Sequence, residues 1–198
     1  MKRILLLLVL FAAAPAHAEF SYSYVQVSGH WQTLEQGYTV AGSTHDTLAG
    51  PGAEISYRVA EFVPYVGVTV RGGHSYEDGT QVHQDTISAL VGYPIPIGER
   101  LSIVPYGRYD RIAAELCPDS SCASVNASGW RYGGLARVWI VQDLLEVSVG
   151  ALESEIEGQG MEYSGGMAIQ TADYQSLRFQ AHVSDEREMY TVAYRFDI

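Results

Sequence analysis

The chain has 198 residues and a formal net charge of -11, and 47% of its residues are hydrophobic. Such an acidic surface argues against binding to nucleic acid and against docking on anionic lipid. The length suits one domain, and beyond the N-terminal region no apolar run is long enough for a transmembrane helix.

The first 18 residues, MKRILLLLVLFAAAPAHA, have the pattern of a bacterial secretory signal peptide. A basic Lys2-Arg3 pair precedes an apolar run, and Ala16-His17-Ala18 fits a small-x-small cleavage site. A membrane anchor, the alternative, needs a longer apolar run. We therefore expect an exported protein of a Gram-negative cell, with a signal peptide at 1–18 and one domain at 19–198.

Segments with an apolar residue at every second position follow the leader, and turn signals separate them. This period of two is typical of strands with two different faces. We expect an all-β antiparallel fold of about ten strands, with eight as the second choice. The segments lie at 20–31, 53–59, 63–71, 86–93, 101–112, 130–140, 144–153, 161–171, 177–184 and 190–198.

The connections between these segments differ in length. We expect long polar loops at 32–50, 73–85 and 117–128, and short turns near 60–62, 94–100, 141–143 and 172–175. The last two connections of the first set, near 157–160 and 185–187, are short. Long loops at one end and tight turns at the other are typical of a transmembrane β-barrel.

Alternation alone fits two architectures. In a soluble sandwich the apolar face forms the core, whereas in a transmembrane barrel it meets lipid and the polar face lines the lumen. Four observations favour an up-and-down barrel in the cell outer membrane: the export signal, the sorted loops, the even strand number and the aromatic residues near strand ends, where we expect girdles at the lipid interface. The aromatic residues are Tyr22, Trp31, Tyr57, Tyr93, Tyr132, Trp139, Tyr194 and Phe196.

Every basic residue after the leader is an arginine. An arginine facing lipid costs about 2–4 kcal/mol at the membrane midplane, whereas a guanidinium inside the barrel pairs with carboxylates through two hydrogen bonds. We therefore expect a lumen network of ion pairs that blocks or narrows the channel. The residues that share the lumen face are Glu54, Arg58, Arg71, Arg108, Asp110, Arg131, Arg137, Glu146, Glu162, Arg178, Arg195 and Asp197.

Two further features concern the loops and the C-terminus. In the stretch LCPDSSCAS we expect Cys117 and Cys122 to form a disulfide, because a metal site needs more ligands and a redox CxxC motif has another spacing. The chain ends on YTVAYRFDI, which we interpret as the strand that closes the barrel against residues 20–31 and as its assembly signal. The residues of this signal are Tyr190, Val192, Tyr194, Phe196 and Ile198.

The stretches GAEISYRVAEFVPYVGV, YGGLARVW and AYRF resemble small bacterial outer-membrane β-barrels of the OmpX/OmpA type. FSYSYVQVSGHW and REMYTVAYRF look closer still to the ten-stranded barrels of the sulfation-dependent quorum factor family. The resemblance implies a fold and a location, together with recognition by the barrel-assembly machinery. It supplies no catalytic or binding motif.

Two histidine patterns are candidates for a catalytic or metal site. His182-Val183-Ser184, with Glu186 and Glu188 close by, resembles the outer-membrane lipid A deacylase family. The glutamate spacing is shorter, Asp185 stands where that family has asparagine, and His182 and Ser184 face the lumen. His74 and His83 flank an acidic stretch, where we favour a solvated loop over a metal site. We therefore expect no enzyme, no cofactor and no metal.

We expect a barrel with a structural or surface-interaction role and a largely plugged lumen. Its partners would be outer-membrane lipid, the barrel-assembly machinery and an unidentified extracellular molecule that contacts the long loops, with no nucleic acid. A small passive pore is the second hypothesis, and a lipid A-modifying hydrolase is the third.

Overall fold

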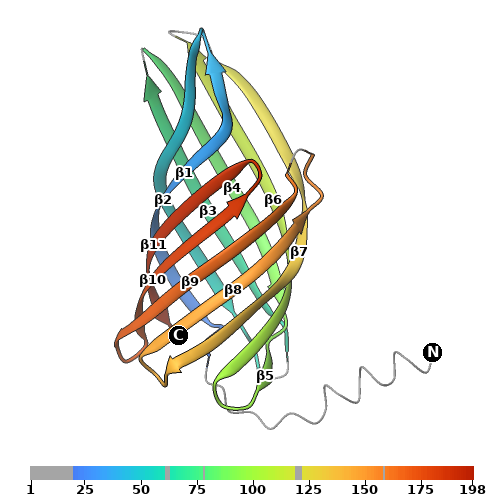
Figure 1. The fold of residues 1–198 in the computed structure, drawn as a ribbon, viewed down its shortest axis with the longest axis vertical. Coiled ribbons are helices and arrows are strands. Elements are labelled where there is room, and N and C mark those ends of the chain that lie inside the picture. The colour runs from blue at the N-terminus through green and yellow to red at the C-terminus, as the bar shows by residue number, and fades with distance from the viewer. Residues whose placement is uncertain (1–19, 61–62, 78, 119–121, 158) are drawn as a thin grey trace, which may run out of the picture.

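The computed structural model describes residues 20–60, 63–77, 79–118, 122–157 and 159–198, so the predicted signal peptide lies outside the described part. Ten strands form one closed antiparallel barrel, and a short strand, β5, pairs with β6 beside it (Figure 1). The strands are β1 Tyr24–Val40, β2 Ser43–Tyr57, β3 Tyr65–Glu77, β4 Thr80–Gly92, β5 Ile95–Ile97, β6 Leu101–Pro118, β7 Ala123–Val141, β8 Leu145–Ser154, β9 Met161–Ala172, β10 Gln175–Ser184 and β11 Arg187–Asp197.

The barrel closes between the first and last strands, as predicted. β1 pairs with β11 in a continuous register from Tyr24 opposite Asp197 to Leu34 opposite Arg187. Closure pairs the backbone groups that an open sheet edge would expose, which is the condition for spanning a membrane with strands. In the described residues no helix is long and apolar enough to cross a membrane.

The two ends of the barrel differ. We call the end that holds Phe20 and the C-terminus the terminal end, and the opposite one the far end (lower and upper ends in Figure 1). At the far end β1 and β2 meet in a two-residue turn, Ala41-Gly42, in which both φ angles are positive. This turn geometry matches the twist of a tight hairpin.

The stretches predicted as long loops are mostly strand. β1 and β2 run through 32–50, β3 and β4 run through most of 73–85, and β7 begins at Ala123, inside the third predicted loop. Polar residues on the outer face weakened the period of two there, because these strand ends lie beyond the apolar band and need no lipid-facing side chains. In β1 a register shift between Thr33 and Tyr38 interrupts the alternation as well.

The two ends of the barrel differ because its strands differ in length, and not because of long loops. β1–β4, β6 and β7 have 13 to 19 residues, whereas β8–β11 have 10 to 12. The long strands therefore rise past the short ones (Figure 1). We call this projecting part, residues 34–48, 74–77, 79–83, 112–118 and 122–130, the far-end extension.

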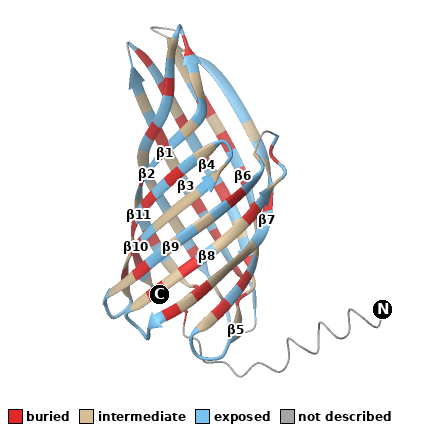
Figure 2. Ribbon diagram, viewed as in Figure 1, coloured by how far each residue is buried: buried red, intermediate tan, exposed pale blue. Residues whose placement is uncertain are grey.

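Outward and inward faces alternate along each strand (Figure 2). On β3, Val66, Val68 and Val70 point outward and are 56%, 46% and 47% exposed. The inward residues are polar and buried, and they include Arg131, Arg137 and nine serines or threonines among the strands. A soluble sandwich would bury the valines, so this arrangement is that of a barrel with an apolar exterior.

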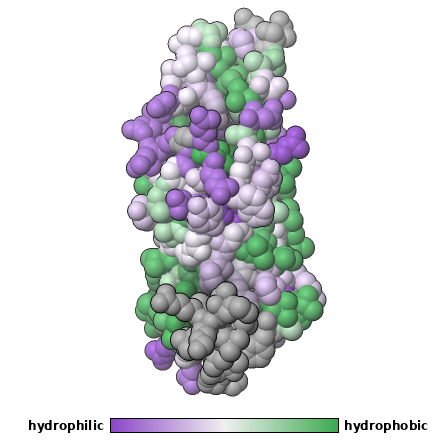
Figure 3. All heavy atoms as spheres, turned by 90° about the vertical axis from the view of Figure 1, so that its right-hand side faces the viewer, coloured by the Kyte–Doolittle hydropathy of each residue, from purple (hydrophilic) through white to green (hydrophobic). Residues whose placement is uncertain are grey.

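The outer surface is divided by height. On the face drawn in Figure 3, hydrophobic residues lie along both sides of the half toward the terminal end, hydrophilic residues gather above them, and a smaller hydrophobic area lies near the far end. The apolar half is the part that fits a membrane, and the far-end extension lies beyond it.

Two predicted girdle residues lie inside the barrel. Tyr22 and Trp139 are 6% and 8% exposed and belong to an internal cluster, so their assignment to the lipid interface was wrong. Trp31 and Tyr57, in contrast, are 56% and 55% exposed and point outward. Parity could not place Tyr22, because residues 20–23 precede β1 and do not follow its alternation.

We predict that Val192→Arg lowers the free energy of unfolding in lipid vesicles by about 2–4 kcal/mol, because Val192 is outward near the middle of β11. Urea titration followed by tryptophan fluorescence measures the change. The control is Thr33→Arg, an outward position above the apolar band, with an expected change of at most about 1 kcal/mol. Equal effects at both positions would contradict the assigned membrane band.

Candidate functional site

The terminal end of the lumen contains an aromatic layer, which we define as Phe20, Tyr22, Tyr65, Val104 and Trp139. The Phe20 and Trp139 rings stack with centroids 5.5 Å apart, and the Tyr22 and Tyr65 rings stack at 5.2 Å. The segment before β1 thus enters the mouth and packs against strands on the opposite wall.

Glycine makes room for one of these rings. A Cβ atom on Gly92 would lie 2.5 Å from the Tyr65 ring, so any side chain there would displace it. The sequence analysis did not predict the aromatic layer. The pairing of Gly92 with Tyr65 in adjacent strands was the feature that could have indicated a ring packed inside.

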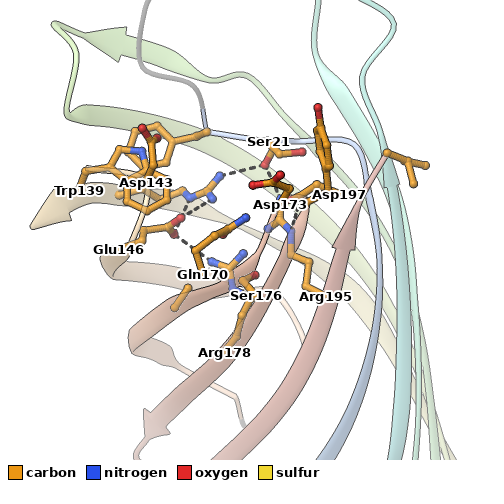
Figure 4. Close-up of a pocket in the computed structure, with 15 residues that line it drawn as sticks. Ser21, Trp139, Asp143, Glu146, Gln170, Asp173, Ser176, Arg178, Arg195 and Asp197 are labelled. Carbon is orange, nitrogen blue, oxygen red and sulfur yellow. Dashed lines mark hydrogen bonds and ion pairs between the residues drawn. The ribbon is translucent and has the colours of Figure 1, made fainter. Parts of the chain in front are cut away.

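Beside the aromatic layer lies the first ionic cluster, seen in Figure 4. Arg137 donates two hydrogen bonds to Glu146, of 2.8 and 2.7 Å, and Arg178 donates a third, of 2.9 Å. Glu146 is 3% exposed, so it is a buried carboxylate held between two guanidinium groups. These three residues come from β7, β8 and β10, and the cluster therefore ties together strands across the wall.

The first ionic cluster also holds the N-terminal segment. The Ser21 carbonyl oxygen accepts hydrogen bonds from Arg137, at 3.4 Å, and from Arg195, whose Nε pairs with Asp197 at 2.8 Å. The Arg137 guanidinium also lies 4.7 Å from the centroid of the Phe20 ring, within range for a cation–π contact. Below the cluster a cavity of about 650 Å³ opens at the terminal end.

A second ionic cluster fills the middle of the lumen. Asp110 pairs with Arg108 at 2.9 Å and with Arg131 at 3.0 Å. Arg131 also pairs with Glu162 at 2.8 Å, and Glu162 accepts a further hydrogen bond from Arg187 at 2.6 Å. Asp110 and Arg131 are 1% and 2% exposed, so the pairing compensates charges that are almost completely removed from water.

Sequence parity placed most of the charged residues of this second cluster, but it missed Arg187. Residues 185–187 read as a turn, yet Arg187 begins β11 and shares the inward parity of Met189 and Arg195. The sequence could have predicted its inward orientation, because the alternation of β11 extends back to Arg187.

Three further residues of the predicted network make other contacts. Glu54 accepts hydrogen bonds from Tyr24 and, at 3.2 Å, from Thr69, away from both ionic clusters. Arg71 faces the second cluster, and its Nη1 atom lies 3.2 Å from the Met189 sulfur. Arg58 follows the end of β2 and donates to the Val63 carbonyl at 3.2 Å, so it lies in the terminal-end turn.

The far end of the lumen is apolar. Its layer, which we call the far-end layer, consists of buried Val40, Leu48 and Val82, with Leu34, Tyr38 and Leu116 packed against them. These residues come from β1, β2, β4 and β6, so β1 reaches across the far-end extension. Buried His45 hydrogen-bonds Ser75 at 3.0 Å and Thr80 at 2.7 Å beside this layer.

The predicted disulfide is present. Cys117, at the end of β6, is bonded to Cys122, which directly precedes β7. It closes the tip of the tall β6–β7 hairpin. The residues between, 119–121, lie outside the described part.

The C-terminal strand has the predicted orientation. Tyr190, Val192, Phe196 and Ile198 are 48%, 50%, 42% and 69% exposed on the outer surface. The Ile198 backbone N–H donates to the Ser23 carbonyl at 3.0 Å, so the last residue is also held.

The candidate hydrolase residues make separate contacts. His182 pairs through Nδ1 with Glu162 at 3.1 Å inside the lumen, whereas the Ser184 hydroxyl interacts with the Arg187 carbonyl at 3.4 Å. A nucleophilic serine requires a hydrogen bond to its base, and these contacts direct the two side chains to different partners.

Comparison with known proteins identifies the fold of the chain through solved structures alone. No family model and no curated protein matches the chain. Among solved structures, the β domain of the Bordetella autotransporter BrkA has a TM-score of 0.53 and 11% identity, covering 89% of this chain and 100% of that one. Neisserial surface protein A has a TM-score of 0.49 and 11% identity, covering 90% and 98%. The chain thus has the fold of small outer-membrane β-barrels, as predicted.

We predict that Glu146→Ala lowers the free energy of unfolding by about 3–5 kcal/mol, because it leaves the buried Arg137 and Arg178 without their carboxylate. Urea titration in vesicles measures the change. Glu153→Ala on the same strand, where the side chain is exposed, is the control, with an expected change of at most about 1 kcal/mol. A similar small change at Glu146 would mean that the cluster does not stabilise the barrel.

Proposed function

We propose that this chain is an outer-membrane protein with a closed lumen and a structural or surface-interaction role. The short turns and both described chain ends then lie on the periplasmic side, and the far-end extension lies outside the cell. The barrel-assembly machinery would recognise β11, whose outward face carries Tyr190, Val192 and Phe196.

The observation that carries the proposal is the filling of the lumen at three levels. The aromatic layer and the first ionic cluster occupy the terminal end, the second ionic cluster occupies the middle, and the far-end layer closes the far-end extension. A barrel of about eight to ten strands has an interior that side chains nearly fill. An ion crossing it would have to displace apolar groups and buried ion pairs in turn.

The form of the far-end extension supports a role in contacts. In the described residues, no strand pairs with β1 after Leu34, or with β7 before Arg131, on the side of the gap that the short strands leave. The free edge of β7 begins ASVNASG, with small uncharged residues, and such an edge presents unpaired backbone groups to a partner. Tyr76 and Val125 add exposed apolar side chains, 70% and 52% accessible.

A small passive pore is the second candidate, and the open cavity at the terminal end favours it. Charged side chains of both signs form the wall of that cavity, with Arg137, Arg178 and Arg195 beside Asp143, Glu146, Asp173 and Asp197, so water can fill it. It ends against the first ionic cluster and Phe20, which is why we place this function second. A lipid A hydrolase is third, since His182 and Ser184 face the lumen and have separate partners.

We predict that the refolded protein gives no current steps in planar lipid bilayers, because buried side chains occupy the lumen at all three levels. Insertion is verified on the same sample by heat-modifiable gel migration. Reproducible step conductance from correctly folded protein would favour the passive pore and reject the closed lumen.

We predict that an epitope inserted between Ala41 and Gly42 is stained by antibody on intact cells, because this turn is the tip of the β1–β2 hairpin. An epitope between Asp173 and Tyr174, in a terminal-end turn, should be stained only after the outer membrane is permeabilised. The reverse pattern would overturn the proposed orientation, and recovery in the soluble periplasm would overturn the location.

A further inference from the structure

Two histidines face each other on the outside of the β3–β4 hairpin. His74 of β3 and His83 of β4 are directly opposite in the strand register. Their Nδ1 atoms lie 2.8 Å apart, and their ring centroids are 4.3 Å apart. The stretch predicted as a solvated loop therefore holds two imidazoles in a fixed pair.

A carboxylate on the same strand orients this pair. The Nε2 atom of His83 lies 3.0 Å from a carboxylate oxygen of Asp85. A carboxylate accepts hydrogen bonds, so Nε2 of His83 carries the hydrogen and its Nδ1 presents a lone pair. His74 then donates from its own Nδ1, and a single proton lies between the two rings.

The spacing of these nitrogens suits a metal ion. Two nitrogens bound at about 2.0–2.1 Å to one square-planar or tetrahedral ion lie about 2.8–3.4 Å apart. Small rotations of the two rings bring the nitrogens further into that range. On binding, the proton of His74 moves from Nδ1 to Nε2, and both Nδ1 lone pairs bind the ion. Asp85 remains hydrogen-bonded to the far nitrogen of His83, which is the common support of a metal-bound imidazole.

The location leaves space for other ligands. His74 is exposed, and the His83 and Asp85 side chains are 37% and 55% accessible. All three lie on the far-end side of Val70 and Ile87, the last outward apolar residues of the band on these strands. Glu115 on β6, the register partner of His83, is exposed on the same face. In the described residues no group of three or more histidine, cysteine, aspartate or glutamate side chains is arranged to hold a metal. The pair thus provides two protein ligands, and water supplies the rest.

We propose that His74 and His83 form a two-histidine site for a divalent late transition-metal ion on the outer surface of the far-end extension. Imidazole nitrogen suits Cu²⁺, Ni²⁺ and Zn²⁺, and Cu²⁺ binds tightest among the divalent ions of this series. Asp85 is a positioning residue, since it holds the His83 ring without touching the ion. The proposal is independent of whether the lumen conducts.

The test uses untagged, refolded mature protein in detergent, titrated with CuCl₂ and followed by calorimetry and by electron paramagnetic resonance. We expect one equivalent of Cu²⁺ with hyperfine coupling to two imidazole nitrogens. His74→Ala and His83→Ala should each weaken binding at least tenfold. Asp85→Asn should weaken it about tenfold or more while both nitrogens stay coupled. The control, Gln81→Ala on the same face of β4, should bind as the unchanged protein does.

The double variant His74→Ala/His83→Ala separates this site from any other copper ligand in the chain, and heat-modifiable migration verifies its fold. Equal copper affinity in the double variant and the unchanged protein would overturn the proposal. Failure of the unchanged protein to bind would overturn it too, and would leave the pair as a hydrogen bond between neighbouring strands.

Discussion

Closure of the sheet is the constraint on which the rest of the structure depends. Once β1 pairs with β11, every second side chain points into a narrow interior with little water. Charges placed there need partners, because an unpaired buried charge costs several kcal/mol. Glu146 between Arg137 and Arg178, and Asp110 between Arg108 and Arg131, meet that requirement.

The charges are not spread evenly around the barrel. The paired residues of both ionic clusters come from β6–β11, whereas the buried polar residues of β1–β4 are mainly neutral, such as Gln26, Gln32 and Gln84. Height divides the strands differently, since β6 and β7 are as long as β1–β4 whereas β8–β11 stop where the second cluster lies. Above that level apolar packing takes over, and the far-end extension is held by Val40, Leu48 and Val82.

Periodicity predicted the parts of the fold that a membrane dictates. The valines of β3 and the outward residues of β11 follow a strict period of two because lipid lies on one side and a polar lumen on the other. The same alternation predicted the inward orientation of Arg131 and Arg137. It could not predict which carboxylate each arginine meets, because that depends on the stagger between strands.

Alternation did not predict the structure of the segments that lie outside the membrane. Residues 32–50 have a polar outer face and a register shift between Thr33 and Tyr38, so they read as a loop although they form the β1–β2 hairpin. Phe20 and Tyr22 precede the first strand, so parity gave no reason to place them inside the mouth. The contact of His74 with His83 needed the β3–β4 register, which one or two residues of slippage would destroy.

A double-mutant cycle on Arg131 and Glu162 tests the central claim most directly, because their ion pair joins β7 to β9 across the interior. Unfolding free energies in vesicles are measured for Arg131→Ala, Glu162→Ala and the combined variant. The account predicts a stabilising coupling energy of about 0.5–3 kcal/mol. Additive effects of the two substitutions, with no coupling, would contradict the claim that paired charges inside the lumen hold the barrel together.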